Sequence, residues 1–152
     1  MDAPAHGIWT WIIFHNNPLV WLAVLFGMLP DLLSWGIYSI WPWGEKLDWK
    51  KPDFSMVPKW VFLLYGITHS VFVFAAVFLI VYLIIGTIPW FLFAWIIHIL
   101  IDIPTHSKDF LPTPFLWPVS TYKFAGISWG QKWFMIANYT AIVVILLVLF
   151  LK

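Results

Sequence analysis

Long apolar runs, separated by short polar or proline-containing breaks, make up most of the chain. Runs at about 18–40, 60–86 and 133–151 are each long enough to cross about 30 Å of hydrocarbon as a helix. A fourth run at 88–103 is slightly short and is expected to end where Pro104 blocks a further helical turn. The pattern predicts an all-α, polytopic membrane helix bundle with four transmembrane spans.

A shorter apolar segment, residues 3–15, precedes these runs. At about 1.5 Å per residue it is too short to span a bilayer, so it is expected to form an interfacial or re-entrant helix. A tight hairpin at Asn16 and Asn17 would return it against the next helix. No internal repeat or linker divides the chain, which we interpret as a single integral membrane domain over 1–152.

Composition supports a bilayer environment. Hydrophobic residues make up 62% of the chain and charged residues only 10%, whereas a soluble domain carries about 25% charged residues. The thirteen Trp suit membrane–water interfaces, and membrane lipids are therefore expected partners. The absence of Cys excludes disulfides and thiol chemistry. With no Arg and no basic run, the sequence predicts no nucleic-acid partner.

The lysines are distributed unevenly between the two expected sides of the membrane. One side holds the loops 41–59 and 104–132, which contain seven lysines. The one lysine on the other side is Lys152. By the positive-inside rule the loops are cytoplasmic, which predicts a multi-pass protein of the inner (plasma) membrane. The loop side carries Lys46, Lys50, Lys51, Lys59, Lys108, Lys123 and Lys132.

Four ionisable residues interrupt the apolar helices: Asp31, His69, His98 and Asp102. Each costs at least about 2.5 kcal/mol near a helix centre, so a functional reason is expected. Counted from the loop side, all four lie at similar depth in one leaflet. His98 and Asp102 are four residues apart and share one helical face. A re-entrant first helix would also bring His6 within reach of Asp31.

Imidazoles and carboxylates together form a nitrogen–oxygen ligand set. Such a set suits a divalent metal, most of all Zn²⁺, with Mn²⁺ or Fe as alternatives, and it has enough ligands for one ion or two. Non-catalytic interpretations remain open for single residues. His69 alone could be a helix–helix hydrogen-bond donor, Asp31 a cap on a broken helix, and His6 a wet interfacial residue.

These residues also carry a family resemblance. Its motifs are His6-Gly7, Leu29-Pro30-Asp31, Thr68-His69-Ser70, the run from His98 to His106, and Phe115-Leu116-Trp117-Pro118. In this order they resemble the predicted membrane-bound metal-dependent hydrolases, the YdjM-like small inner-membrane proteins of bacteria and archaea. More distantly, the chain is similar to zinc-dependent phospholipase C. The family resemblance implies hydrolysis at the bilayer and a metal centre built from His6, Asp31, His69, His98 and Asp102.

The resulting hypothesis is a membrane-embedded hydrolase that cleaves a lipidic ester or phosphoester through a metal-bound hydroxide near the cytoplasmic leaflet. His106 is expected to act as general acid or to touch the head group, which Lys108 and Lys123 would hold by charge. Hydroxyl groups near the site are expected to orient the ligands. These belong to Ser34, Thr68, Ser70 and Thr105.

Two other classes of protein use similar residues. A metal or proton transporter would string ionisable groups through the full depth of the membrane, whereas here they cluster in one leaflet. A structural or assembly protein would use the His and Asp side chains only to hold the bundle together, and the sequence also allows a homo-oligomer.

Overall fold

The computed structural model describes residues 1–42, 47 and 52–151, which form helices and loops without a β-strand. The lysines at 46, 50, 51 and 152 that entered the prediction of sidedness lie outside the described residues. The α-helices are α1 (Ala3–Phe14), α2 (Val20–Asp31), α3 (Ile37–Ile40), α4 (Lys59–Thr68), α5 (Val71–Ile85), α6 (Phe93–Thr105) and α7 (Lys132–Phe150). A π-helical turn, η1 (Leu32–Gly36), joins α2 to α3, and η2 (Phe54–Met56) and η3 (Trp90–Leu92) are short 3₁₀ turns.

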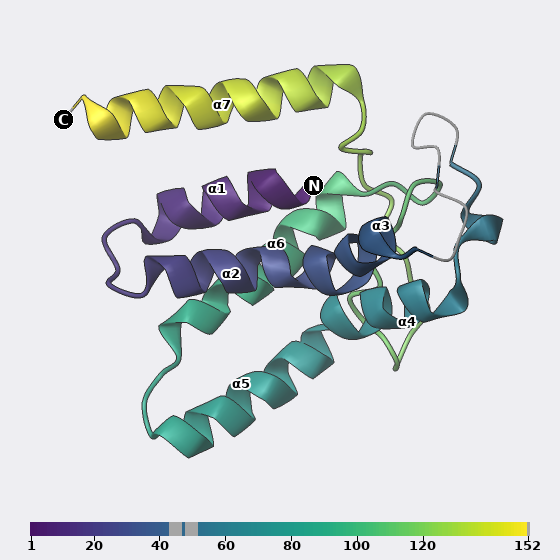
Figure 1. Cartoon of the computed structure of the whole chain (residues 1–152), viewed down its shortest axis with the longest axis horizontal. Coiled ribbons are helices and arrows are strands. Elements are labelled where there is room, and N and C mark those ends of the chain that lie inside the picture. The colour runs from purple at the N-terminus through teal and green to yellow at the C-terminus, as the bar shows by residue number, and fades with distance from the viewer. Residues whose placement is uncertain (43–46, 48–51, 152) are drawn as a thin grey trace.

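The helices are arranged so that short turns and long loops lie at opposite ends of the molecule (Figure 1). The turn between α1 and α2, the turn after α5 and the C-terminus lie at one end. At the other end is the long connection between α6 and α7, and the N-terminus lies near the middle of the view, at the end of α1 that points toward these loops. Helix α2 is central, because it packs against both α1 and α6, while α7 lies along the outer side of α1.

Two helical segments are long and apolar enough to cross a membrane. They are Val20–Ile40, with 21 residues, and Lys132–Phe150, with 19. Helices α4 and α5 qualify together as a third, but their axes are bent by 57° at a short break. The apolar helical segment Trp90–Thr105 is shorter than a full span.

Two helix boundaries differ from the sequence prediction. The helix expected over 60–86 is divided into α4 and α5, because His69 and Ser70 leave helical geometry. Helix α6 also continues through Pro104 to Thr105. A proline in the last turn removes one amide donor only, and the Thr105 hydroxyl donates to the carbonyl of Ile101 at 2.9 Å.

Local backbone and side-chain groups set three of the helix ends, namely the start of α1 and both ends of α5. Asp2 accepts a hydrogen bond from the Ala5 amide at 2.9 Å and so caps the start of α1. The Ser70 side chain caps α5 in the same way, by accepting from two amides of its first turn. Gly86 ends α5 with φ 69°, a left-handed conformation that favours glycine.

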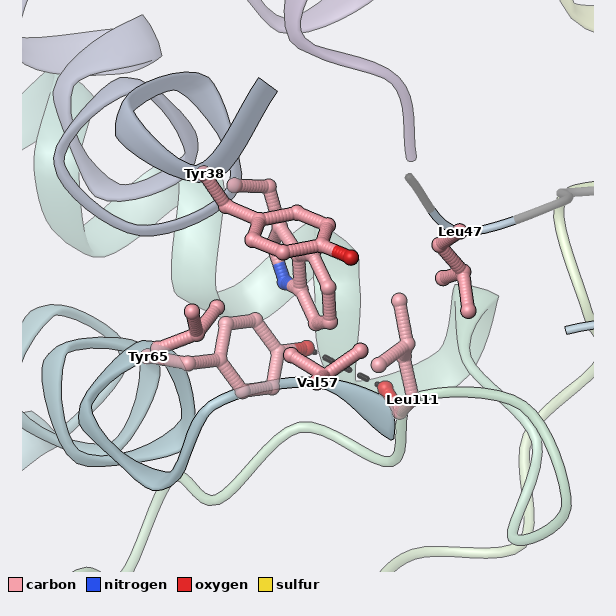
Figure 2. Packing of buried hydrophobic residues seen from close by; sticks show 7 residues of the cluster. Tyr38, Leu47, Val57, Tyr65 and Leu111 are labelled. Atoms are coloured by element: carbon pink, nitrogen blue, oxygen red, sulfur yellow. Dashed lines mark hydrogen bonds between the residues drawn. The ribbon is translucent and has the colours of Figure 1, made fainter. Parts of the chain in front are cut away.

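The buried core consists of a cluster at the loop end, a cluster around α6 and a smaller one between α1 and α7. One aromatic cluster beneath the loops includes Tyr38, Leu47, Val57, Tyr65 and Leu111 (Figure 2). Helix α5 has no buried residue and α7 has only one, although both are strongly apolar. Their outward side chains therefore present hydrocarbon to the surroundings, as expected of helices in a bilayer.

Helices α1 and α2 pack closely through glycines. Gly27 lies against Thr10, where a Cβ would meet Thr10 Oγ1 at 2.2 Å, and Gly7 lies against Met28, whose flexible side chain would have to shift to admit a Cβ. The turn between the two helices is closed by a hydrogen bond from the Asn17 amide to the Phe14 carbonyl at 2.8 Å. As a result α1 lies within the bundle, and His6 is almost completely buried.

Candidate metal centre

A disturbance in the second helical segment places Asp31. Pro30 precedes it, and the π-helical turn η1 follows directly. Such turns leave a backbone carbonyl without its usual amide donor, and they often occur at functional sites. Here the carbonyl of Pro30 accepts hydrogen bonds from the hydroxyls of Ser34, at 2.8 Å, and Thr68, at 3.1 Å. These contacts tie the Asp31 region of α2 to the end of α4.

The break between α4 and α5 places His69 at the same level. Thr68 is the last residue of α4, and its carbonyl accepts a hydrogen bond from Trp95 Nε1 at 2.7 Å. Ser70 caps α5 and donates to the carbonyl of Trp117. His69 itself is completely buried. The break therefore turns its imidazole into the bundle, and the polar groups of the broken backbone are satisfied locally.

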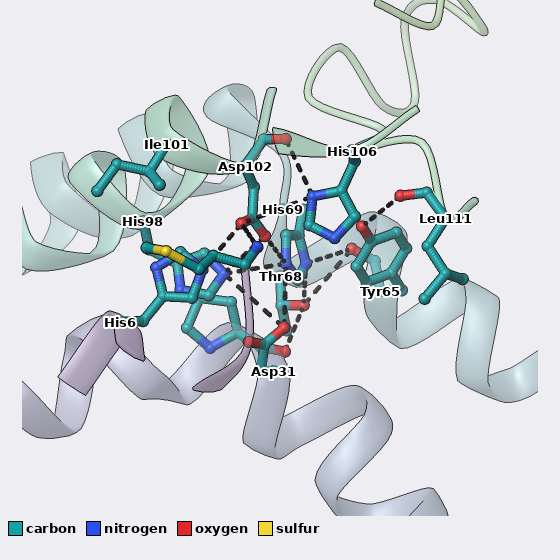
Figure 3. Close-up of polar contacts among 12 residues, drawn as sticks. His6, Asp31, Tyr65, Thr68, His69, His98, Ile101, Asp102, His106 and Leu111 are labelled. Carbon is teal, nitrogen blue, oxygen red and sulfur yellow. Dashed lines mark hydrogen bonds and ion pairs between the residues drawn. The ribbon is translucent and has the colours of Figure 1, made fainter. Parts of the chain in front are cut away.

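Helix α6 contributes the remaining two side chains of the cluster. His98 and Asp102 lie one turn apart on its buried face, as the spacing predicts. Together with Asp31 and His69 they offer four ligand atoms that all lie within 4.8 Å of one another (Figure 3). This cluster, hereafter the His–Asp cluster, could hold a metal ion.

Hydrogen bonds set the same tautomer in both histidines of the cluster. His98 Nδ1 lies 2.7 Å from the Gly27 carbonyl, and His69 Nδ1 lies 3.1 Å from the Tyr65 carbonyl. A carbonyl can only accept, so each Nδ1 carries the proton and each Nε2 keeps its lone pair. The two Nε2 atoms face each other at 3.1 Å. This orientation, with Nδ1 held by a carbonyl, is typical of metal-binding histidines.

The distances between ligand atoms agree with tetrahedral coordination. Ligands at about 2.0–2.2 Å from a central ion are roughly 3.3–3.6 Å apart in a tetrahedron. Asp102 Oδ2 lies 3.4 Å from His69 Nε2 and 3.3 Å from His98 Nε2. Asp31 Oδ1 is somewhat farther, at 3.7 and 3.9 Å from the same nitrogens. Three ligands are therefore closely set, and Asp31 is the loosest member.

Asp102 Oδ2 gives independent support for a cation. It is buried and has no hydrogen-bond partner within the described part of the chain. A buried carboxylate oxygen without a donor is costly unless a positive charge compensates it. Two carboxylates and two imidazole lone pairs converge on this space, and the Met1 ammonium at Asp102 Oδ1 offsets one of the two negative charges. The donor set still suits a cation.

His6 lies behind Asp102 and not among the four closest ligand atoms. Its Nε2 lies 2.8 Å from Asp102 Oδ1, the carboxylate oxygen on the other side of the cluster. The amino group of Met1 contacts the same oxygen. The His6 ring also stacks on His98 with centroids 3.7 Å apart. The structure thus gives His6 contacts that orient Asp102 and His98, while the sequence predicted it as a direct ligand.

His106 lies at the end of α6 with both ring nitrogens engaged. Its Nδ1 donates to the Asp102 carbonyl at 3.0 Å, and its Nε2 accepts from Trp129 Nε1 at 3.2 Å. Burial lowers the pKa of His106 to about 4, so the ring is neutral near pH 7. The predicted role as general acid would therefore require Trp129 to move away first.

The other predicted residues divide into two groups. Ser34, Thr68, Ser70 and Thr105 all hydrogen-bond to backbone groups, and Thr68 also lies 3.1 Å from His69 Nδ1. Lys108 and Lys123 are exposed on the loop, away from the cavity described next. Sequence reasoning did not single out the Gly27 carbonyl or Trp129, because neither residue has a polar pattern that marks it.

A cavity of about 320 Å³ opens beside the His–Asp cluster. Its wall includes Asp31 and His106, the apolar side chains of Leu32 and Leu111, and the indole of Trp129. Asp31 is the one cluster residue that lines this cavity, and its side chain is 15% exposed while the other three are fully buried. The loosest ligand therefore faces the open space, where a substrate could reach the site.

Comparison with known proteins gives no relative for this chain. No protein-family model matches it, and no curated protein or solved structure matches it significantly.

Proposed function

We propose that the protein is a membrane-embedded metal-dependent hydrolase of a lipidic ester or phosphoester. The observation that carries the proposal is the coincidence of the His–Asp cluster with the cavity at Asp31. Three ligands are tightly set, and the fourth, Asp31, is looser and faces the cavity, from which water or substrate could reach the ion. Catalytic zinc sites keep a position open in this way, whereas structural zinc sites are closed. A divalent ion bound here supplies Lewis-acid activation of water and substrate.

Each residue of the cluster has a defined task in this proposal. His69, His98 and Asp102 hold the ion, with their orientation set by the contacts to Tyr65, Gly27 and His6. Asp31 completes the ligand set on the cavity side, and its free carboxylate oxygen accepts the proton of the attacking water. The leaving alkoxide takes up that proton when the ester bond breaks.

The ring of His106 forms part of the cavity wall and contacts the substrate there. Both ring nitrogens of His106 are already hydrogen-bonded, so in this proposal the neutral ring bounds the space for the head group and donates no proton to it. The exposed ammonium groups of Lys108 and Lys123 attract an anionic head group toward the loop side.

The proposed membrane topology has four spans: Val20–Ile40, the bent pair of α4 and α5, the segment Trp90–Thr105, and α7. The short third segment is tolerated because α6 is buried against α2 and α5. The loop side is cytoplasmic in an inner membrane by the distribution of lysines. All Asp and Lys side chains of the described residues lie toward this end, and His15 is the one described histidine near the opposite end. This distribution favours a local site over a transport path.

The test is the metal content of the purified protein, measured by elemental analysis. Wild type should retain one or two equivalents of a divalent metal, most of all zinc. His98→Ala and Asp102→Ala should lose it. His15→Ala is the matched control, because His15 lies at the opposite end and bonds only to the Ile12 carbonyl. A wild-type protein without metal, or cluster variants that retain it fully, would refute the proposal.

A further inference from the structure

A second cavity, of about 420 Å³, lies along the same pair of helices as the first. It is bounded by Gly7 and Ile8 of α1, Val24 and Met28 of α2, and Leu146 and Phe150 of α7. All of these side chains are apolar, and the cavity contains no ionisable group among its lining residues. We call it the apolar groove.

The apolar groove and the cavity at Asp31 follow one helical face. On α2 the groove is lined by Trp21, Val24 and Met28, and the cavity begins at Asp31 and Leu32. Steps of three or four residues keep all these positions on one face of the helix. On α1 the cavity is lined by residues 1–3 and the groove begins at Pro4. The two spaces therefore meet end to end along the seam of α1 and α2.

Contacts near the loops hold α7 against α1, and the groove is open at its far end. Near the loops, α7 is fastened to α1 by hydrogen bonds from Trp9 to Asn138, at 2.9 Å, and from Tyr139 to Asp2, at 3.0 Å. At the far end Trp21 and Phe150 are 72% and 73% exposed, so the groove opens toward the surroundings there. In a bilayer these surroundings are acyl chains.

We infer that the apolar groove binds an acyl chain of the substrate lipid, with the ester or phosphoester placed at Asp31 and His106. This inference rests on the proposed function and adds to it a substrate class and an orientation. At about 1.5 Å per residue, the ten residue steps from Trp21 to Asp31 span about 15 Å along the axis of this helical segment. An extended acyl chain of roughly twelve carbons has the same length. The chain enters laterally, with its methyl end near Trp21 and Phe150.

The size of the groove favours a lipid chain over a helix of a partner protein. A helix about 10 Å wide and 15 Å long occupies on the order of 1,200 Å³, well above the groove's volume. A single acyl chain is narrow and flexible enough to lie between α1, α2 and α7. Gly7 and Met28 both line the groove, and a Cβ at position 7 would lie 2.7 Å from Met28 Sδ. The absence of a side chain at Gly7 therefore leaves this part of the groove open.

The experiment uses the full-length protein in phosphatidylcholine nanodiscs and a photoreactive probe, dodecyl phosphate with a diazirine on its terminal carbon. After irradiation, cross-linked residues are mapped by mass spectrometry. Saturable labelling should concentrate near Trp21 and Phe150 and be displaced by unlabelled dodecyl phosphate. Labelling spread evenly over the outward faces of α5 and α7 would overturn the inference.

Substitutions to Trp provide matched variants. Val24→Trp fills the middle of the groove, and saturable labelling should fall about tenfold because the chain no longer fits. Val148→Trp is the control: Val148 lies on α7, two residues from Leu146, and is 50% exposed. It should label like wild type. Leu146→Trp blocks the groove from the α7 side and should repeat the loss; unchanged labelling in both groove variants would refute the inference.

Metal analysis of the same samples separates the two proposals. Val24→Trp should keep the wild-type metal content, because Val24 does not touch the His–Asp cluster. If wild type holds metal but its labelling cannot be saturated, the inference that the groove binds an acyl chain is refuted, while the hydrolase proposal is not. Saturable labelling of a wild-type protein that holds no metal would refute the hydrolase and, with it, the identification of the bound lipid as a substrate.

Discussion

Gly27 couples the packing of α1 and α2 to the orientation of the His–Asp cluster. A Cβ at position 27 would lie 2.2 Å from Thr10 Oγ1 and 3.0 Å from Thr10 Cβ. Non-bonded carbon atoms prefer separations of about 3.5–4.0 Å, so Gly27→Ala must push α1 away by about 1 Å. The Gly27 carbonyl also holds His98 Nδ1 at 2.7 Å, and this hydrogen bond would be disturbed by the shift.

The expected magnitude combines two effects. Overpacking of a well-packed interface costs about 1–3 kcal/mol, and weakening the hydrogen bond to His98 costs about 1 kcal/mol. Gly27→Ala should therefore lower the free energy of unfolding by about 2–4 kcal/mol and weaken metal binding about 10-fold or more. Thr10→Ala removes the closest atom, so the double variant should recover more than half of the lost stability.

The assay is denaturant unfolding in detergent micelles, with metal affinity measured by chelator competition on the same preparations. Gly36→Ala is the control, because a Cβ there meets no atom closer than 3.5 Å outside its immediate chain neighbours. Because Gly36 has helical backbone angles, this variant should be as stable as wild type or more stable by up to about 1 kcal/mol. A Gly27→Ala protein as stable as wild type, or a loss that Thr10→Ala does not relieve, would show that this contact is not tight.

Three further predictions concern the surroundings of the cluster. His6→Gln should leave the metal stoichiometry intact but weaken binding about 10- to 100-fold in chelator competition, because His6 contacts Asp102 from behind; an unchanged affinity would refute this role. Trp129→Phe removes the donor to His106 Nε2, so carbethoxylation of His106, followed by mass spectrometry, should become faster than in wild type; equal rates would contradict the contact. Removal of metal by a chelator should lower the thermal midpoint of wild type, because uncompensated carboxylates remain buried, and should not lower that of His98→Ala; an equal drop in both would point to a nonspecific effect of the chelator.

Much of the candidate site follows from patterns along the chain. Ionisable residues are rare in the apolar segments, so Asp31, His69, His98 and Asp102 stand out in the sequence. Helical periodicity places His98 and Asp102 on one face, and depth counted from the loops brings the other two to the same level. These inferences depend only on local geometry and on the cost of charge in hydrocarbon, which is why the structure brings these four residues together.

The break at His69 and the role of His6 were not predictable in this way. The run 60–86 is apolar apart from the Thr68-His69-Ser70 segment and contains no proline, so the sequence predicts a continuous helix there. The break is stable because Trp95, from another helix, donates to the freed Thr68 carbonyl. His6 contacts Asp102 Oδ1 instead of the cluster's centre because α1 approaches that side of α6. Both outcomes depend on partners that are distant in sequence.

The sequence by itself thus determined the helical class of the protein, the apolar character of its long helices and the four residues that gather in the His–Asp cluster, because hydropathy and helical period are local properties. Only the tertiary structure decided which nitrogen of each histidine is free, which oxygen of Asp102 is left without a donor, and where a cavity reaches the site. Tautomers and free lone pairs are set by carbonyls of neighbouring segments, such as that of Gly27, and cavities by the space that packed helices leave between them.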